Sequence, residues 1–256
     1  LSAKDGPIVP LIAETGGLNA MVVDPSALPE QVCDAVLQSA FRSAGQRCSA
    51  LRLLCLHEDI AEPVLQMIAG AVRELKVGEP ARFDTDVGPL IDAEAHADVL
   101  AQVERLRREA RPLWDLAAGS SMPAPHGDGT PSAAMAHLLA PHAFEVDSPA
   151  RVGQEIFGPV LQVWRWRGDP QAVIEQVNQL GYGLTLGIQT RIDSRAQALA
   201  RAARVGNVYV NRNMVGAVVG LQPFGGQGLS GTGPKAGGPH YLPRFCVEQT
   251  VTVNTT

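Results

Sequence analysis

The sequence contains no long apolar run, and its contents of charged and aromatic residues are low. Its 256 residues include 21 Lys or Arg and 26 Asp or Glu, so the formal net charge is −5. No apolar run approaches the ~18 residues that a membrane-spanning helix needs, and we expect no transmembrane segment. The mild negative charge and the lack of a long basic run argue against nucleic-acid binding. Hydrophobic residues make up 45% of the chain, so we expect a globular protein with a sizeable core.

The four cysteines form no pattern typical of a metal site or a disulfide framework. They are Cys33, Cys48, Cys55 and Cys246. No two of them form a CxxC pair, and none is grouped with the six histidines, so we expect no metal ligands. Scattered thiols are typical of a reducing compartment, and we predict a cytoplasmic location. Cys33, Cys55 and Cys246 fall on apolar segments and are expected to be buried.

Strands alternate with helices along most of the chain, which predicts an α/β fold with a largely parallel sheet and flanking helices. We expect strands at residues 9–13, 51–56, 160–166, 184–190, 208–211 and 246–253, and helices at 28–43, 59–75, 91–108, 169–179 and 194–205. The Gly-, Pro- and Ser-rich stretch 117–132 is expected to be a mobile surface insertion. The last predicted strand is suited to pairing with another sheet, such as that of a partner subunit.

Cys48 is the cysteine best placed to act as a nucleophile. It follows the small-residue turn Gly45-Gln46-Arg47 rather than an apolar element. A reactive thiol needs access and a lowered pKa, which Arg47 and the backbone amides of the turn could supply. The alternative is an ordinary buried thiol, which is the commoner role for a cysteine.

Two carboxylates are candidates for the same site. Glu14 follows the apolar segment 9–13, so we expect it at the end of a strand, where α/β proteins form their sites. A partly desolvated Glu14 would have the raised pKa that suits a general base; a solvated loop carboxylate is the alternative. Glu155 and Phe157 precede a predicted strand and could bind vicinal hydroxyls and support a flat ring, or could be ordinary surface and core residues.

Residues 226–231 match the GxGxxG pattern of dinucleotide-binding proteins, but we reject this match. The pattern needs a strand before it and a helix after it. Here Pro223-Phe224-Gly225 precedes it, and Thr232-Gly233-Pro234 follows it.

Four motifs in this order resemble those of the aldehyde dehydrogenase family. They are Glu14-Thr15-Gly16-Gly17-Leu18-Asn19, Gly45-Gln46-Arg47-Cys48, Glu155-Ile156-Phe157-Gly158-Pro159 and Pro223-Phe224-Gly225-Gly226. The stretches AETGGLNAMVVD, FRSAGQRCSALRLLCL and GAVVGLQPFGGQGLSGTGPKAGGPHYLPRF are similar to the L-glutamate-γ-semialdehyde (pyrroline-5-carboxylate) dehydrogenase part of the bifunctional proline utilization A family. The resemblance covers nearly the whole chain.

The resemblance implies an NAD-dependent oxidation of L-glutamate γ-semialdehyde to L-glutamate in proline catabolism. Cys48 would form a thiohemiacetal and then a thioester with the substrate, its backbone N–H would contribute to the oxyanion hole, and Glu14 would activate the hydrolytic water. The residues implied to contact NAD are Glu155, Phe157 and Gly16. Those implied to contact the substrate are Ser49, Gly216, Ala217 and Phe224, the first three at its carboxylate.

The resemblance also implies domain boundaries. Residues 1–20 would be the tail of an NAD-binding domain otherwise absent from the chain, 21–240 the catalytic domain, and 241–256 a strand for homo-oligomerisation. The chain would then be a catalytic-domain fragment that is inactive alone. FAD would be needed only if the parent protein carries an upstream proline dehydrogenase domain. Two alternatives stay open: an aldehyde dehydrogenase for another aldehyde, and a non-catalytic assembly domain.

Overall fold

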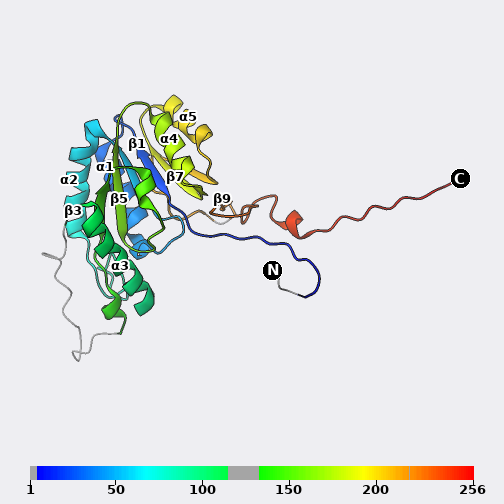
Figure 1. Cartoon of the computed structure of the whole chain (residues 1–256), viewed down its shortest axis with the longest axis horizontal. Helices are drawn as coiled ribbons and strands as arrows, with labels where there is room; N and C mark the ends of the chain where they lie inside the picture. Colours follow the sequence, from blue (N-terminus) through cyan, green and yellow to red (C-terminus); the bar gives the residue numbers. More distant parts are fainter. Residues whose placement is uncertain (1–4, 115–132, 219) are drawn as a thin grey trace.

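A seven-stranded sheet runs through the centre of the molecule (Figure 1). The computed structural model describes residues 5–114, 133–218 and 220–256, and the predicted insertion at 117–132 lies outside them. The strand order is β3-β4-β5-β2-β1-β7-β8, and every pair is parallel except β3 with β4. The strands are β1 (Ala20–Val23), β2 (Leu53–His57), β3 (Arg111–Trp114), β4 (His142–Val146), β5 (Val160–Trp166), β7 (Thr185–Gln189) and β8 (Asn207–Val210). A separate small sheet pairs β6 (Tyr182–Gly183) with β9 (Gln227–Gly228).

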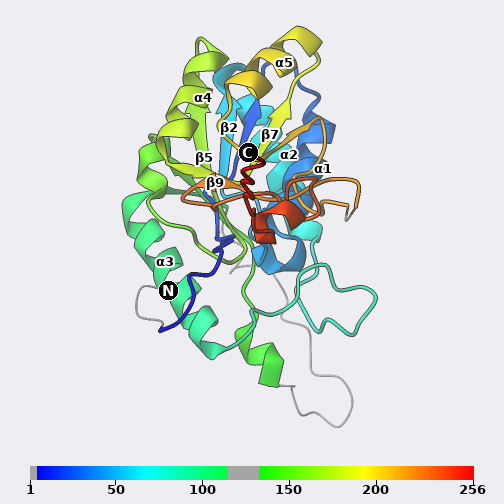
Figure 2. The same cartoon turned by 90° about the vertical axis from the view of Figure 1, so that its right-hand side faces the viewer.

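Helices cover both faces of the sheet, as the two perpendicular views show (Figures 1 and 2). One face carries α1 (Pro29–Ala40), α2 (Glu58–Glu74) and α3 (Ala93–Glu109), and the other carries α4 (Pro170–Gln179) and α5 (Asp193–Ala202). Short 3₁₀ helices lie at η1 (Arg42–Gly45), η2 (Ala133–His137), η3 (Pro149–Val152) and η4 (Leu242–Phe245).

The central strands serve two hydrophobic cores. Met21 and Val23 of β1 pack into the core beneath α1, α2 and α3, whereas Ala20 and Val22 pack into the core beneath α4 and α5. A parallel strand that is buried on both faces is apolar at every position, and this is why AMVV of β1 and LLCL of β2 have no polar alternation. The predicted α/β class with a largely parallel sheet and flanking helices is therefore confirmed.

The predicted strand at residues 9–13 is wrong. This segment lies mostly exposed on the surface, and the first sheet-like pairing is the isolated bridge between Glu14 and Gly231. Residues 246–253 are extended, pair with no strand of the described chain and leave the main body as an arm (Figure 1), so their pairing with a partner's sheet stays a prediction. Cys246 is exposed on this arm, whereas Cys33 and Cys55 are buried as expected.

Two strands were not predicted: β3, which is the edge strand of the sheet, and β4, which lies between β3 and β5. Pro112 interrupts β3, and His142 and Glu145 break the apolar pattern of β4. Short edge strands that carry Pro or charged residues are common in sheets, because these residues discourage pairing with other chains. Such strands have little apolar periodicity from which they could be recognised.

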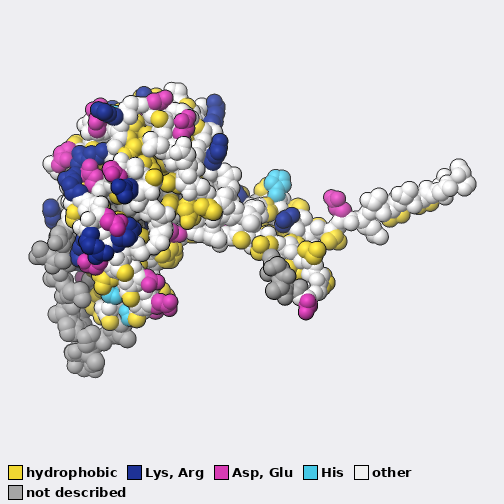
Figure 3. Space-filling model, viewed as in Figure 1, with side chains coloured by type: hydrophobic (Ala, Val, Ile, Leu, Met, Phe, Trp, Pro, Cys, Tyr) yellow, Lys and Arg dark blue, Asp and Glu magenta, His cyan; other side chains and the backbone are white. Residues whose placement is uncertain are grey.

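Charged side chains of both signs cover much of the main body, whereas the arm is nearly free of charge (Figure 3). Within residues 246–256, Glu248 is the only charged side chain. Among the described residues, no helix combines the length and apolar character that crossing a membrane requires.

Candidate active site

The predicted site residues converge at the amino edge of the parallel sheet. Glu14 precedes β1, Cys48 precedes β2, and Glu155 precedes β5. The register aligns Ala20 of β1 with Leu53 of β2, so the segments that enter these neighbouring strands meet. Our expectation that Glu14 follows a strand is wrong, because the first strand begins only after Glu14. The candidate site is therefore at the edge opposite to the carboxyl edge that α/β proteins commonly use.

A strained turn delivers the nucleophile loop, residues 46–50, to this edge. Ser43, Ala44 and Gly45 have φ values of 56°, 53° and 66°, so three consecutive residues are in the left-handed region. Only glycine adopts this conformation without strain. A Cβ atom on Gly45 would also lie 2.2 Å from the carbonyl oxygen of Gly158, so this position needs glycine on two counts.

Cys48 is exposed on the nucleophile loop, as a nucleophile requires. Partial burial raises the pKa of the Cys48 thiol above its ordinary value, and the adjacent backbone amides of Ser49 and Cys48 oppose this shift without cancelling it. The carboxylates of Glu155 and Glu14 raise this pKa further. We predicted a lowered pKa with help from Arg47. This prediction is wrong, because the Arg47 side chain donates to the Ser43 hydroxyl (3.1 Å) and contributes nothing to the shift.

An open cavity of about 620 Å³ lies beside Cys48. Six residues that the sequence analysis selected line it together: Cys48, Ser49, Phe157, Gly216, Ala217 and Phe224. Gln46 and Arg47 of the nucleophile motif also line it, as do four residues that we did not predict: Gly220, Gln222, Ala236 and Gly237. The nucleophile loop and the loop after β8 therefore line one cavity, although they lie far apart in the sequence.

The loop after β8 presents backbone amides to the cavity. Met214 and Val215 are buried and anchor the loop, and the Met214 amide donates to the Ser39 hydroxyl (3.0 Å). Gly216 follows with a φ of 77°. Among the described residues, the amides of Gly216 and Ala217 have no hydrogen-bond acceptor. Successive amides of this kind form a concave site that suits an anion such as a carboxylate.

Glu155 is held beside Gly16 and Gly17 by two interactions. Its carboxylate forms an ion pair with Arg52 (3.0 Å) and accepts a hydrogen bond from the Gly17 amide (3.1 Å). A Cβ atom on Gly16 would lie only 1.7 Å from the carboxylate, so this approach depends on glycine. The sequence analysis missed Arg52, although a single arginine within the apolar run ALRLL was the available signal.

Glu14 does not line the cavity, and it lies against the glycine-rich segment instead. Its carboxylate accepts a hydrogen bond from the Gly226 amide (3.1 Å). Partial burial raises the pKa of Glu14, and this hydrogen bond opposes the shift without cancelling it. The rejected GxGxxG match contains β9, which pairs with β6 rather than leading from a strand into a helix. Its rejection is therefore confirmed.

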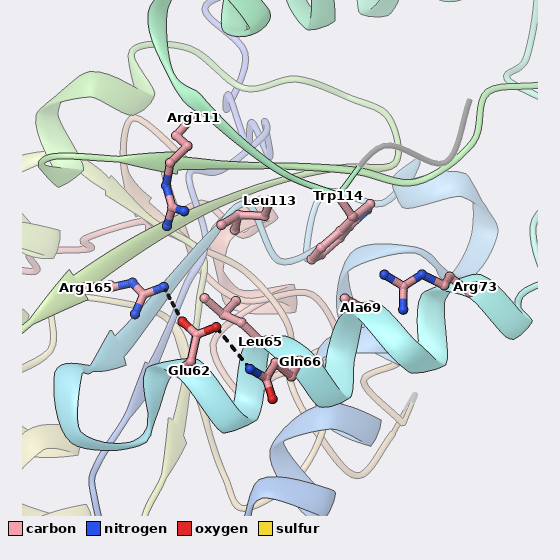
Figure 4. A pocket seen from close by; sticks show the side chains of 9 residues that line it. All are labelled: Glu62, Leu65, Gln66, Ala69, Arg73, Arg111, Leu113, Trp114 and Arg165. Carbon is pink, nitrogen blue, oxygen red and sulfur yellow. Dashed lines mark hydrogen bonds and ion pairs between the residues drawn. The ribbon is translucent and has the colours of Figure 1, made fainter. Parts of the chain in front are cut away.

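A second, smaller cavity of about 270 Å³ lies between α2, β3 and β5 (Figure 4). Within it, Glu62 accepts hydrogen bonds from Arg165 and Gln66, shown as dashed lines. Arg165 and Arg111 also pair with Glu145. The residues that line it include no Cys, Ser, Thr or His. Because this second cavity has no nucleophile, the first cavity is the candidate active site.

Comparison with known proteins gives consistent matches. The model of the aldehyde dehydrogenase family matches residues 1–251. The bifunctional protein PutA of Escherichia coli (strain K12) is 54% identical over 247 residues, which are 96% of this chain but 18% of that protein.

Two solved structures extend this result. A variant of proline utilization A (PutA) from Bradyrhizobium japonicum superimposes with a TM-score of 0.88 at 55% identity, covering all of this chain and 25% of that one. A 1-pyrroline-5-carboxylate dehydrogenase from Thermus with bound NAD superimposes with a TM-score of 0.79 at 37% identity, over 91% of this chain and 43% of that one. The chain therefore spans less than half the length of these relatives.

Proposed function

This chain belongs to the aldehyde dehydrogenase family, and we propose that it is the thiol-bearing part of an NAD-dependent dehydrogenase that oxidises L-glutamate γ-semialdehyde to L-glutamate. The observation that carries the proposal is the cavity in which Cys48 meets Ser49 and the amides of Gly216 and Ala217. A thiol beside bare amides suits a substrate that has an aldehyde at one end and a carboxylate at the other. The similarity to PutA and to 1-pyrroline-5-carboxylate dehydrogenase supports this substrate.

In this proposal the Cys48 thiolate attacks the carbonyl carbon of the aldehyde. A carbon–sulfur bond forms, and the carbonyl oxygen becomes an oxyanion to which the Cys48 amide donates a hydrogen bond. The loss of one such donor typically lowers the rate by about 10²–10³. Ser49 and the amides of Gly216 and Ala217, which line the same cavity, would bind the substrate carboxylate. Phe224 would pack against its methylene groups.

Glu14 would act as the general base. Its raised pKa makes it a better proton acceptor than an ordinary carboxylate. It would activate the water that hydrolyses the thioester, which releases L-glutamate and restores the Cys48 thiol. Because Glu14 lies outside the cavity lining, it would act through a water molecule or after a side-chain rotation.

The residues around Glu155 fit a nicotinamide cofactor. Gly16 and Gly17 leave a cradle without side chains next to the Glu155 carboxylate, which has capacity to accept hydrogen bonds from ribose hydroxyls. The ring of Phe157 is 46% exposed at the cavity. Glu155, Phe157 and Gly16 would hold the cofactor, and NAD⁺, when bound, supplies the hydride acceptor for the oxidation.

The proposal includes the domain roles expected from the sequence. Residues 1–20 would belong with an NAD-binding domain, 21–240 would form the catalytic domain, and 241–256 would join subunits of a homo-oligomer. The exposed side chains of Val247, Val251 and Val253 on the extended arm support the last of these roles. The chain would be inactive without the rest of the enzyme, and we place this enzyme in the cytoplasm, since its four cysteines are free thiols.

The test is NADH formation by the natural full-length protein, with pyrroline-5-carboxylate and propanal compared at equal concentration. We expect kcat/KM to favour the carboxylated substrate more than about tenfold, which is about 1.4 kcal/mol of transition-state preference. Ser49→Ala should lower this preference, and Cys48→Ala should abolish turnover of both substrates. Ser26→Ala is the matched control, because Ser26 bonds Thr190 and lies outside the cavity lining.

Equal values for the two substrates would contradict the substrate assignment and favour a dehydrogenase for other aldehydes. NADH formation from neither substrate would contradict the enzymatic function. Alkylation of Cys48 by iodoacetamide no faster than that of buried Cys33 would then favour a non-catalytic assembly domain.

A further inference from the structure

Three polar side chains are buried in one row beneath the nucleophile loop. Arg52, Asn19 and Thr185 are 1%, 2% and 2% exposed. Each lies one residue before a residue of the sheet: Leu53 of β2, Ala20 of β1 and Leu186 of β7. These three sheet residues are paired with one another in the strand register. Those three apolar residues face the core beneath α4 and α5. Because side chains alternate along a strand, the polar row faces the opposite side, where the nucleophile loop lies.

Asn19 is the centre of this row. Its side-chain amide donates to the carbonyl oxygens of Cys48 (2.6 Å) and Ala50 (2.9 Å). Its own carbonyl oxygen accepts a hydrogen bond from the Thr185 amide (3.1 Å), which fixes the orientation of the side chain. A buried side chain thus binds the carbonyl group of the candidate nucleophile itself.

The two neighbours of Asn19 bind the remaining carbonyl groups of the loop. Arg52 donates through Nη2 to the carbonyl oxygen of Arg47 (3.2 Å). The Thr185 hydroxyl donates to the carbonyl oxygen of Ser49 (3.4 Å). The three side chains of the row therefore bind the four carbonyl groups of residues 47–50 and hold them on the sheet side of the loop.

Holding these carbonyl groups determines where the amides point. In a planar trans peptide, the C=O of one residue and the N–H of the next point in opposite directions. A sheet-facing Arg47 carbonyl therefore directs the Cys48 N–H away from the sheet, and a sheet-facing Cys48 carbonyl does the same for the Ser49 N–H. These are the two amides that favour the thiolate form of Cys48.

We propose that Asn19 and Arg52, supported by Thr185, are positioning residues that aim the backbone amides of Cys48 and Ser49 at the Cys48 thiol. This inference rests on the proposed role of Cys48 as the nucleophile. The charged groups that also act on this thiol are the carboxylates of Glu155 and Glu14 and the guanidinium of Arg52. Asn19 carries no charge, so its replacement changes the amide geometry without adding or removing a charge.

The test measures alkylation of Cys48 by iodoacetamide against pH, read by mass spectrometry in the natural full-length protein. Free N-acetylcysteine, alkylated in the same solution, is the reference for reagent and pH. Asn19→Ala should raise the midpoint of the Cys48 profile and lower its rate relative to this reference about tenfold at neutral pH, since one pKa unit changes the thiolate fraction tenfold. Asn19→Ala should also lower kcat for aldehyde oxidation while leaving the aldehyde KM within twofold, because Asn19 does not line the cavity.

Asn178→Ala is the matched control. The Asn178 side chain also donates to one backbone carbonyl, that of Ala202 (3.0 Å), and accepts from one backbone amide, that of Arg204 (2.8 Å), and it lies away from the site. An unchanged Cys48 profile in folded Asn19→Ala would overturn the proposal. A fall of the same size in Asn178→Ala would also overturn it, because the effect would then reflect general destabilisation.

A second pair of variants keeps the proposal testable if Asn19→Ala does not fold. Thr185→Val removes one hydroxyl at nearly constant size and should lower the relative rate about twofold to threefold, and Thr185→Ser should restore it. Equal rates in both variants would overturn the proposal. The measurement needs neither aldehyde nor cofactor, so a full-length protein that forms no NADH contradicts the proposed function without affecting this result.

Discussion

Replacement of Arg52 by methionine removes the most buried charge at the site while keeping an unbranched apolar side chain of similar length. The guanidinium donates to Glu155 through Nε (3.3 Å) and Nη2 (3.0 Å). It also donates to the carbonyl oxygens of Gly158 and Arg47 (3.2 Å each). Arg52→Met therefore leaves a partly buried carboxylate and two carbonyl groups without this partner.

The expected destabilisation follows from this geometry. Breaking a buried ion pair by removing one partner typically costs about 3–5 kcal/mol. The Glu155 side chain is 16% exposed, so water can solvate part of the remaining charge, and we expect the lower end, about 3 kcal/mol. For a domain of this size, about 2–4 °C of melting temperature is lost per kcal/mol, which predicts a decrease of about 6–12 °C.

The assay is denaturant unfolding of Arg52→Met, Glu155→Gln and the double variant. The double variant should be less destabilised than the sum of the single variants by about 1–3 kcal/mol, since the two side chains are in contact. Arg107→Met, which removes the exposed pair with Glu104, is the control and should cost less than about 1 kcal/mol. A loss for Arg52→Met no larger than this control, or a coupling energy near zero, would refute the reasoning.

Three further predictions follow from the loop geometry, the thiol environment and the arm. Gly45→Ala should lower the free energy of unfolding, measured with denaturant, by at least about 2 kcal/mol. The left-handed conformation alone costs a non-glycine residue about 1–2 kcal/mol, and the added Cβ would meet the Gly158 carbonyl. Gly168→Ala is the control and should cost less, because Gly168 also has a positive φ but lies in open space. The rate of Cys48 alkylation should rise with pH to a midpoint above the ordinary thiol value of about 8.5, because burial raises the thiol pKa, and a midpoint below that value would contradict the environment described. Deletion of residues 247–256 should reduce the oligomeric state measured by size-exclusion chromatography with light scattering without lowering the melting temperature of the main body, and an unchanged oligomeric state would contradict the role of the arm.

The fold class could be predicted from local sequence. Strands buried on both faces are apolar at every position and helices have a 3.6-residue period, so both kinds of element have a recognisable pattern. The turn before Cys48 also marked it as a candidate nucleophile, whereas the loop at Gly216 was selected only through the resemblance to the aldehyde dehydrogenase family. The structure brings these two segments together around one cavity.

The place of the site in the fold and the surroundings of the thiol could not be predicted, because they depend on segments that only folding brings together. The sign of the Cys48 pKa shift depends on burial and on carboxylates from two distant segments, Glu14 and Glu155. The row of Arg52, Asn19 and Thr185 depends on the register of three strands that long stretches of sequence separate. No local pattern encodes such a register, because it results from packing the whole sheet between its two layers of helices.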